Sequence, residues 1–126
     1  MLATAQRGVY DAQSRGLSPE RLRKHFMRGT GANAGSMRVR PELLRLVEFR
    51  TFNLMNTNWS ELGGAFDIVF CRNVMIYFNA ATQRRVLEGM HGVIKPGGLL
   101  YVGHSENFTE ARDLFRLRGK TIYERV

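Results

Sequence analysis

The sequence has 126 residues, which is enough for one compact domain and too few for two domains with independent cores. Its composition, 44% hydrophobic and 24% charged, is typical of a globular protein. No apolar run approaches the roughly 18 residues that a membrane span needs, and the first residues lack a secretory signal, so we expect a cytoplasmic protein without membrane insertion. The single cysteine, Cys71, excludes an internal disulfide and a cysteine-rich metal site.

The net charge of +8 raises the question of an anionic partner, and residues 1–50 hold most of the excess, with ten basic against four acidic residues. Nucleic-acid binding usually adds aromatic side chains that stack on bases, but this part of the chain offers only Tyr10, Phe26 and Phe49. Arginine also pairs with carboxylates. An acidic protein surface or peptide, or a solvated basic face, explains the charge as well, and we predict no nucleic-acid partner.

The first third of the chain predicts two helices and a small antiparallel hairpin. Residues 2–15 contain good helix formers and end at a glycine, while Ser18 is typical of the N-cap of a second helix that runs to residue 26. Short alternating segments at residues 25–28 and 37–40 flank a glycine-rich loop, which predicts the hairpin.

The rest of the chain alternates helices and strands. Residues 41–44 can open a helical turn, and residues 47–52 alternate apolar and polar side chains like a strand. Residues 66–71 (FDIVFC) are nearly continuous apolar, which is typical of a buried parallel strand, and a helix over residues 80–94 leads to a second such strand at residues 99–103. Strand, helix and strand in this order predict a parallel βαβ unit.

The predicted helix over residues 80–94 has one apolar face and begins after Asn79, a plausible N-cap. Residues 95–98 (KPGG) end it. The apolar face consists of Val86, Leu87, Met90, Val93 and Ile94. The chain closes with a predicted hairpin of residues 115–117 and 121–123, with its turn at the intervening glycine.

Polar residues follow both predicted parallel strands, and the carboxyl ends of such strands are where open α/β sheets bind ligands. Arg72, Asn73 and Tyr77 come after the first strand, and residues 103–108 (GHSENF) come after the second. Two alternatives remain open: Arg72 and Asn73 could instead cap the following helix, and residues 103–108 could be a turn rich in capping residues.

Five segments of the chain resemble, in matching order, the CheR family of chemoreceptor glutamate methyltransferases. The segments are GLSPERLRKHFMRGTG (16–31), MRVRPELLRLVEFRTFNL (37–54), FDIVFCRNVMIYF (66–78), KPGGLLYVGHSENF (95–108) and FRLRGKTIYE (115–124). The resemblance implies methyl transfer from S-adenosylmethionine to glutamate side chains of bacterial chemoreceptors, with S-adenosylhomocysteine as product. No general base is needed, because a glutamate with a pKa near 4.3 is already ionised and the sulfonium methyl is activated. No metal is implied.

The resemblance also assigns roles to individual residues. Asn53 and Leu54, at the end of the predicted strand 47–52, would contact the adenine side of the cofactor. Arg72 and Asn73 would line the cofactor pocket, and Tyr77 would lie close to the transferred methyl group. We infer that Arg72 could also hold the incoming carboxylate, so Arg72 and Tyr77 are the candidate catalytic residues.

The chain differs from the family at its beginning. The family's cofactor domain opens with a strand, an acidic glycine-containing loop and a second strand ending in a ribose-binding acid, after an N-terminal helical domain, and none of these precedes residue 1. We therefore expect residues 1–126 to be a C-terminal fragment of a Rossmann-like class I methyltransferase domain of the α/β class, lacking strands 1 and 2 and inactive alone.

Methyltransferases of this class resemble one another in the strand order 3-2-1-4-5-7-6. Without strands 1 and 2, strand 3 (residues 47–52) and strand 4 (residues 66–71) would each expose an edge. We expect the fragment to form a strand-paired or swapped homodimer, or strand 3 to be drawn across to strand 4.

The hairpin over residues 25–40 corresponds, by resemblance, to a small β-subdomain of the family. Members with extra glycines in its loop bind a C-terminal tethering pentapeptide of the receptor as an added strand. The residues expected to take part here are Arg28, Gly29, Gly31, Gly35, Arg38 and Arg40. A plain glycine loop is the alternative.

Three functions therefore compete. The first is a methyltransferase of which this chain is one part. The second is a non-catalytic module that only binds the receptor. The third, driven by charge alone, is nucleic-acid binding, whose affinity would fall steeply with salt.

Overall fold

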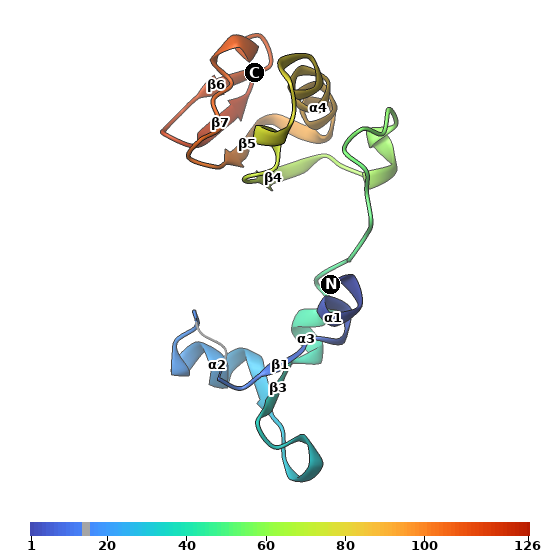
Figure 1. Ribbon diagram of the computed structural model, residues 1–126, viewed down its shortest axis with the longest axis vertical. Helices are drawn as coiled ribbons and strands as arrows, with labels where there is room; N and C mark the ends of the chain where they lie inside the picture. Colours follow the sequence, from blue (N-terminus) through green and yellow to red (C-terminus); the bar gives the residue numbers. More distant parts are fainter. Residues whose placement is uncertain (14–15) are drawn as a thin grey trace. The chain divides into compact units, whose positions relative to one another are not determined.

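The computed structural model describes residues 1–13 and 16–126, and the chain divides into two units, Met1–Phe52 and Asn53–Val126. Figure 1 shows the two units.

The first unit is built on a three-stranded antiparallel sheet in the order β1-β3-β2. The predicted hairpin is confirmed as β2 (Phe26–Arg28) and β3 (Ser36–Val39), with Met27 opposite Arg38. The third strand, β1 (Val9–Asp11), pairs with the other edge of β3. The central strand of the subdomain therefore has a partner on each side, and the outer edges belong to β1 and β2.

The prediction of one helix over residues 2–15 is wrong, because α1 covers only Leu2–Arg7 and β1 follows it. Gly8 ends the helix in a left-handed conformation with φ of 65°, and its N–H donates to the carbonyl of Thr4. This is a common helix end, and it turns the chain toward β3. Residues 14 and 15 of the prediction lie outside the described residues.

The second predicted helix is confirmed as α2 (Pro19–His25), and the side chain of Ser18 accepts a hydrogen bond from the Arg21 N–H at 3.3 Å. The predicted turn after the hairpin is the short helix α3 (Pro41–Leu44). One-turn 3-10 helices also occur in the chain: η1 (Gly31–Asn33), η2 (Trp59–Leu62), η3 (Met75–Tyr77) and η4 (Thr109–Ala111).

Residues 47–52 do not form the predicted strand. A strand persists where a neighbour completes its ladder of hydrogen bonds, and none of the described strands pairs with this segment. The expectation that it is drawn across to the strand at residues 66–71 is therefore also wrong.

The second unit contains a mixed four-stranded sheet in the order β4-β5-β7-β6, which equals the 4-5-7-6 part of the expected order. β4 (Phe66–Cys71) and β5 (Ile94–Val102) are parallel and are connected through α4 (Ala80–Val93), so the βαβ prediction is confirmed. β6 (Phe115–Leu117) and β7 (Ile122–Arg125) form the predicted hairpin, and β7 pairs antiparallel with β5.

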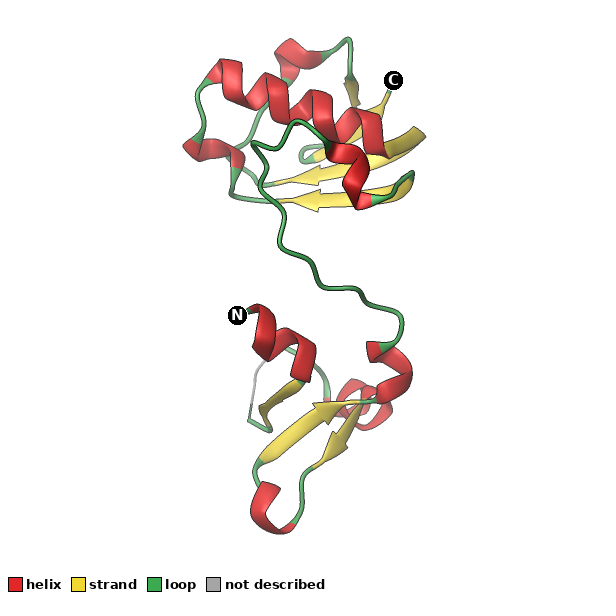
Figure 2. Cartoon of the chain, turned by 90° about the vertical axis from the view of Figure 1, so that its right-hand side faces the viewer, coloured by secondary structure: helices red, strands yellow, loops and turns green. Residues whose placement is uncertain are grey.

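The core of this unit lies between α4 and one face of the sheet, as Figure 2 shows. The Asn79 side chain caps α4 by accepting from the Thr82 N–H at 2.9 Å, as predicted. β5 begins at Ile94 and includes the predicted break at residues 95–98, where its pairing with β4 shifts register. The largest fully buried side chains of the core are Phe115, Met75, Ile94, Leu100, Val86 and Val102.

The prediction that β4 is a buried strand is confirmed for one of its faces and wrong for the other. Its alternating side chains place Val69 and Cys71 on the core side, whereas Ile68 and Phe70 are 49% and 69% exposed. Phe70 stacks on Tyr101 of the neighbouring strand, with ring centroids 4.7 Å apart. In the described sheet β4 has one partner, β5, so its outer edge and one of its faces are open.

Candidate functional site

The parallel strands β4 and β5 end side by side, with Cys71 opposite Val102. Arg72 and Asn73 follow β4, and Gly103 follows β5. The structure therefore brings Asn73 together with the segment after β5, at the edge of the sheet where a ligand site was predicted.

The segments after β4 and β5 pack so closely that they restrict which residues are tolerated at positions 73 and 103. Asn73 has a left-handed backbone with φ of 61°, a conformation that asparagine tolerates better than most residues. A Cβ at Gly103 would collide with the Asn73 side-chain oxygen and would lie 3.0 Å from Glu106 Oε1. Any larger residue at position 103 would have to displace the Asn73 side chain, which favours glycine there.

The Glu106 side chain lies between the two strand ends and is buried, with 5% of the residue exposed. Its Oε1 accepts from the backbone N–H groups of Asn73 and Gly103, both at 2.8 Å, and its Oε2 accepts from that of Met75 at 2.8 Å. No role for Glu106 follows from the sequence alone. The only signal was its place in the GHSENF segment directly after a buried strand.

Cys71 is buried beside this carboxylate. Burial, and then the negative charge of Glu106, raise the pKa of the Cys71 thiol to about 11. The thiol is therefore protonated at neutral pH, which makes it a poor nucleophile and indicates a structural role in the strand.

Arg72 and Tyr77 are exposed, Tyr77 to 81%. Met75, which lies between them in the chain, is only 1% exposed. The side chain of Gln83 in α4 donates to the carbonyl of Met75 at 2.8 Å. Met75 and its contact with Gln83 thus hold the segment against the core, while Arg72 and Tyr77 face solvent. The capping alternative for Arg72 and Asn73 is wrong, because Asn79 caps α4.

Asn53 and Leu54 begin the second unit. The Asn53 side chain accepts from the Met55 N–H at 2.9 Å, and its carbonyl accepts from the Asn56 N–H at 2.9 Å, which forms a tight turn. Leu54 packs partly buried against the core. Leu54 lines a pocket whose lining does not include Arg72, Asn73 or Tyr77. This pocket therefore does not bring the predicted cofactor residues at positions 53 and 54 together with those after β4.

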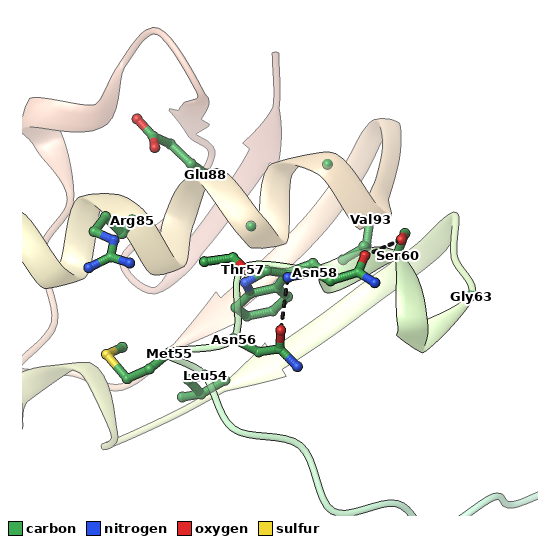
Figure 3. Close-up of a pocket in the computed structure, with 13 residues that line it drawn as sticks. Leu54, Met55, Asn56, Thr57, Asn58, Ser60, Gly63, Arg85, Glu88 and Val93 are labelled. Carbon is green, nitrogen blue, oxygen red and sulfur yellow. Dashed lines mark hydrogen bonds between the residues drawn. The ribbon is translucent and has the colours of Figure 1, made fainter.

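This pocket has a volume of about 540 Å³ and lies between residues 54–63 and α4 (Figure 3). Trp59, the only tryptophan of the chain, sits against Gly89 of the helix, where a Cβ would overlap its indole ring. The missing side chain at Gly89 therefore leaves space on α4 for the Trp59 indole, which packs the segment that carries Asn53 and Leu54 against the helix.

In the first unit, Arg28, Gly29 and Arg38 line a pocket of about 590 Å³. Gly31 and Gly35 have φ of 58° and 87°, so the loop geometry itself accounts for these two glycines. Arg40 is engaged elsewhere: its guanidinium donates to the carbonyls of Lys24 and Arg23 at 3.0 and 3.1 Å, at the C-terminus of α2.

Within residues 1–13 and 16–126, no group of three or more histidine, cysteine, aspartate or glutamate side chains is arranged to hold a metal ion. No helix in the same part of the chain is long and apolar enough to cross a membrane.

Comparison with known proteins identifies the family. Residues 1–124 match the model of the CheR methyltransferase, SAM binding domain. The chain therefore belongs to this family, which confirms the resemblance, and S-adenosylmethionine (SAM) is the cofactor of the domain.

Curated relatives agree. The chain is 47% identical over 124 residues to a chemotaxis protein methyltransferase of Klebsiella aerogenes, covering 98% of this chain and 42% of that protein. It is 49% identical to chemotaxis protein methyltransferase 2 of Pseudomonas aeruginosa and 44% identical to the Escherichia coli protein, covering 98% of this chain and 44% and 43% of theirs. The chain spans less than half the length of these relatives.

Among solved structures, an O-methyltransferase family protein from Burkholderia thailandensis matches 58% of this chain and 24% of its own, at 30% identity. The TM-score of 0.43 is too low to add to the comparison.

The contact between Trp59 and Gly89 can be tested by comparing two glycines of α4. Gly92→Ala adds a methyl group in open space, and we expect it to stabilise the chain by up to about 1 kcal/mol, because alanine favours helix. Gly89→Ala must displace the indole, and we expect it to destabilise by about 1–3 kcal/mol. Urea unfolding followed by Trp59 fluorescence measures both, and equal stabilisation would show that the contact is absent.

Proposed function

We propose that the protein containing this chain transfers the methyl group of SAM to glutamate side chains of chemoreceptors in the cytoplasm, giving methyl esters and S-adenosylhomocysteine. The family of the domain and the names of the relatives support this proposal. The observation that carries it is the anchored segment after β4, which presents Arg72 and Tyr77 to solvent at the carboxyl end of the sheet.

The residues at the strand ends fit this cofactor, because they offer polar groups to a ligand that carries a carboxylate, an amino group and hydroxyls. When bound, SAM supplies an activated methyl group. Arg72 is a cation that can hold an incoming carboxylate, and Asn73 and Tyr77 can orient the ligand beside it. Orientation of two reactants can lower such a barrier by roughly 7–11 kcal/mol, so the site needs no covalent nucleophile.

Arg72 can be tested in the full-length protein that carries this chain. Because Arg72 is exposed and outside the core, Arg72→Ala should leave the fold intact. Loss of a charge-assisted contact of about 1.5–3 kcal/mol should lower methyl transfer to receptor by roughly 10- to 100-fold. Release of base-labile radioactive methyl groups from the receptor measures the rate. The exposed Arg112→Ala serves as control, and an unchanged rate in Arg72→Ala would contradict the assigned role.

We also propose that residues 1–126 alone bind SAM weakly and do not methylate receptors. Of the proposed contacts the chain supplies Asn53, Leu54, Arg72, Asn73 and Tyr77, and it covers only 42% of the Klebsiella aerogenes relative. Calorimetry should therefore show no saturation at micromolar SAM. A micromolar complex with one SAM per chain would refute this.

The open edge of β4, with Ile68 and Phe70 exposed beside it, supports a further proposal, which is that two copies of the isolated chain associate through strand pairing. A monomeric mass in light scattering at high protein concentration would exclude this association.

A second candidate function is receptor-peptide binding by the first unit, whether or not catalysis occurs. The supporting observation is the pocket beside the sheet, which Arg28 and Arg38 line together with apolar Val9, Met27 and Met37. Because β3 is paired on both sides, a peptide strand would add to the outer edge of β1 or β2.

An acidic peptide with an aromatic residue should shift the backbone amide NMR signals of β1 or β2 during a titration. Arg38→Ala should weaken binding several-fold by removing a charge from the pocket, while Arg45→Ala, an exposed arginine outside that lining, should not. Salt should weaken binding only partly, because backbone hydrogen bonds are less screened than exposed charges. Shifts confined to residues 66–108, or no shifts, would exclude the idea.

A further inference from the structure

We propose that Glu106 is a positioning residue for the ligand-binding segment Arg72 to Tyr77, and that its buried carboxylate fixes this segment through backbone N–H groups. The inference rests on the proposed function, which places the ligand contacts in that segment. Glu106 itself belongs to the segment after β5 and acts only through the backbone of the segment after β4.

The geometry of the carboxylate supports this role. Its two oxygens accept three hydrogen bonds at 2.8 Å, and every donor in this set is a backbone N–H: Asn73, Met75 and Gly103. Burying a carboxylate is unfavourable unless donors of this kind replace water. A glutamate at this place therefore holds the two strand ends at a fixed separation.

The positions of the donors explain how the effect reaches the ligand residues. Arg72 lies between buried Cys71 and the N–H of Asn73 that Glu106 holds. The Met75 N–H is the first in η3, which ends at Tyr77. Glu106 therefore fixes the backbone at two points between the two exposed side chains, at Asn73 and at Met75, although it makes no described hydrogen bond to either side chain.

Glutamate is specifically suited to this task. Glutamine has the same shape, but only its amide oxygen accepts hydrogen bonds. Its NH2 group is a donor and would face a backbone N–H group that needs an acceptor. Aspartate is one methylene shorter and cannot reach both strand ends with the same backbone.

The first experiment measures amide hydrogen exchange by NMR in the 126-residue chain. Glu106→Gln should raise the exchange rates of the Asn73, Met75 and Gly103 amides at least about 10-fold, while amides in β5 and β7 keep their protection. Glu110→Gln, an exposed glutamate four residues further on, is the control and should change none of them. Unchanged exchange of the three amides in Glu106→Gln would overturn the proposal.

A measurement on the unmodified chain covers the case in which the variant fails to fold. Scalar couplings across the hydrogen bonds should join the Glu106 carboxylate carbon to the amide nitrogens of Asn73, Met75 and Gly103. Their absence would also overturn the proposal. Neither measurement depends on methyl transfer, so both decide the role of Glu106 in the turn even if the proposed function fails.

The second experiment tests the consequence for the ligand in the full-length protein. Glu106→Gln should raise the KM for SAM about 10-fold or more, with a smaller change in kcat, because the groups that hold the ligand are displaced while the chemistry needs no base. An unchanged KM in a variant whose three amides exchange faster would show that Glu106 stabilises the turn without positioning the ligand. An unmodified protein without methyl-transfer activity would refute the proposed function alone.

Discussion

A single buried carboxylate connects the ends of the two parallel strands, and much of the site depends on it. Glu106 accepts hydrogen bonds from the backbone of both segments, at Asn73 and at Gly103. Glu106 Oε1 also lies close to where a Cβ at position 103 would stand, and the charge of the carboxylate adds to burial in raising the pKa of Cys71. One charge thus connects the two strand ends and adds to the burial that keeps the thiol beside it protonated.

The sequence predicted those elements that local physical chemistry specifies. Ser18 and Asn79 begin helices because their side chains accept from N–H groups three residues further on, and such signals are visible without a fold. The nearly continuous apolar run at Phe66–Cys71 likewise predicted β4. The errors concern pairing: residues 47–52 have strand-like alternation but no partner strand, whereas Val9–Asp11 becomes a strand because β3 lies beside it.

The candidate site also combines features that the local sequence predicted with features that depend on contacts between distant parts of the chain. The place after β4 was predictable because carboxyl ends of parallel strands bind ligands, and the structure exposes Arg72 and Tyr77 there. The role of Glu106 was not, because its partners Asn73 and Met75 lie 33 and 31 residues away in the chain. For Arg40, which was expected to contact a peptide, the structure adds a contact that the sequence did not indicate: its guanidinium donates to two carbonyls at the end of α2.

The ion pairs show where the net charge of +8 is offset by neighbouring acids, which the composition alone does not show. In the second unit, Arg84 binds Asp113 and Glu88, and both Arg116 and Arg118 bind Glu124. The hydrogen bonds from these arginines lower the pKa of Asp113 and of Glu124, so both acids stay ionised and offset the basic charge locally. In the first unit Arg40 binds neutral carbonyls, which leaves its charge uncompensated. Among the described residues, the first unit offsets its basic excess with fewer ion pairs, of which Arg50 with Glu48 is one, and Arg28 and Arg38 place part of that excess beside its sheet.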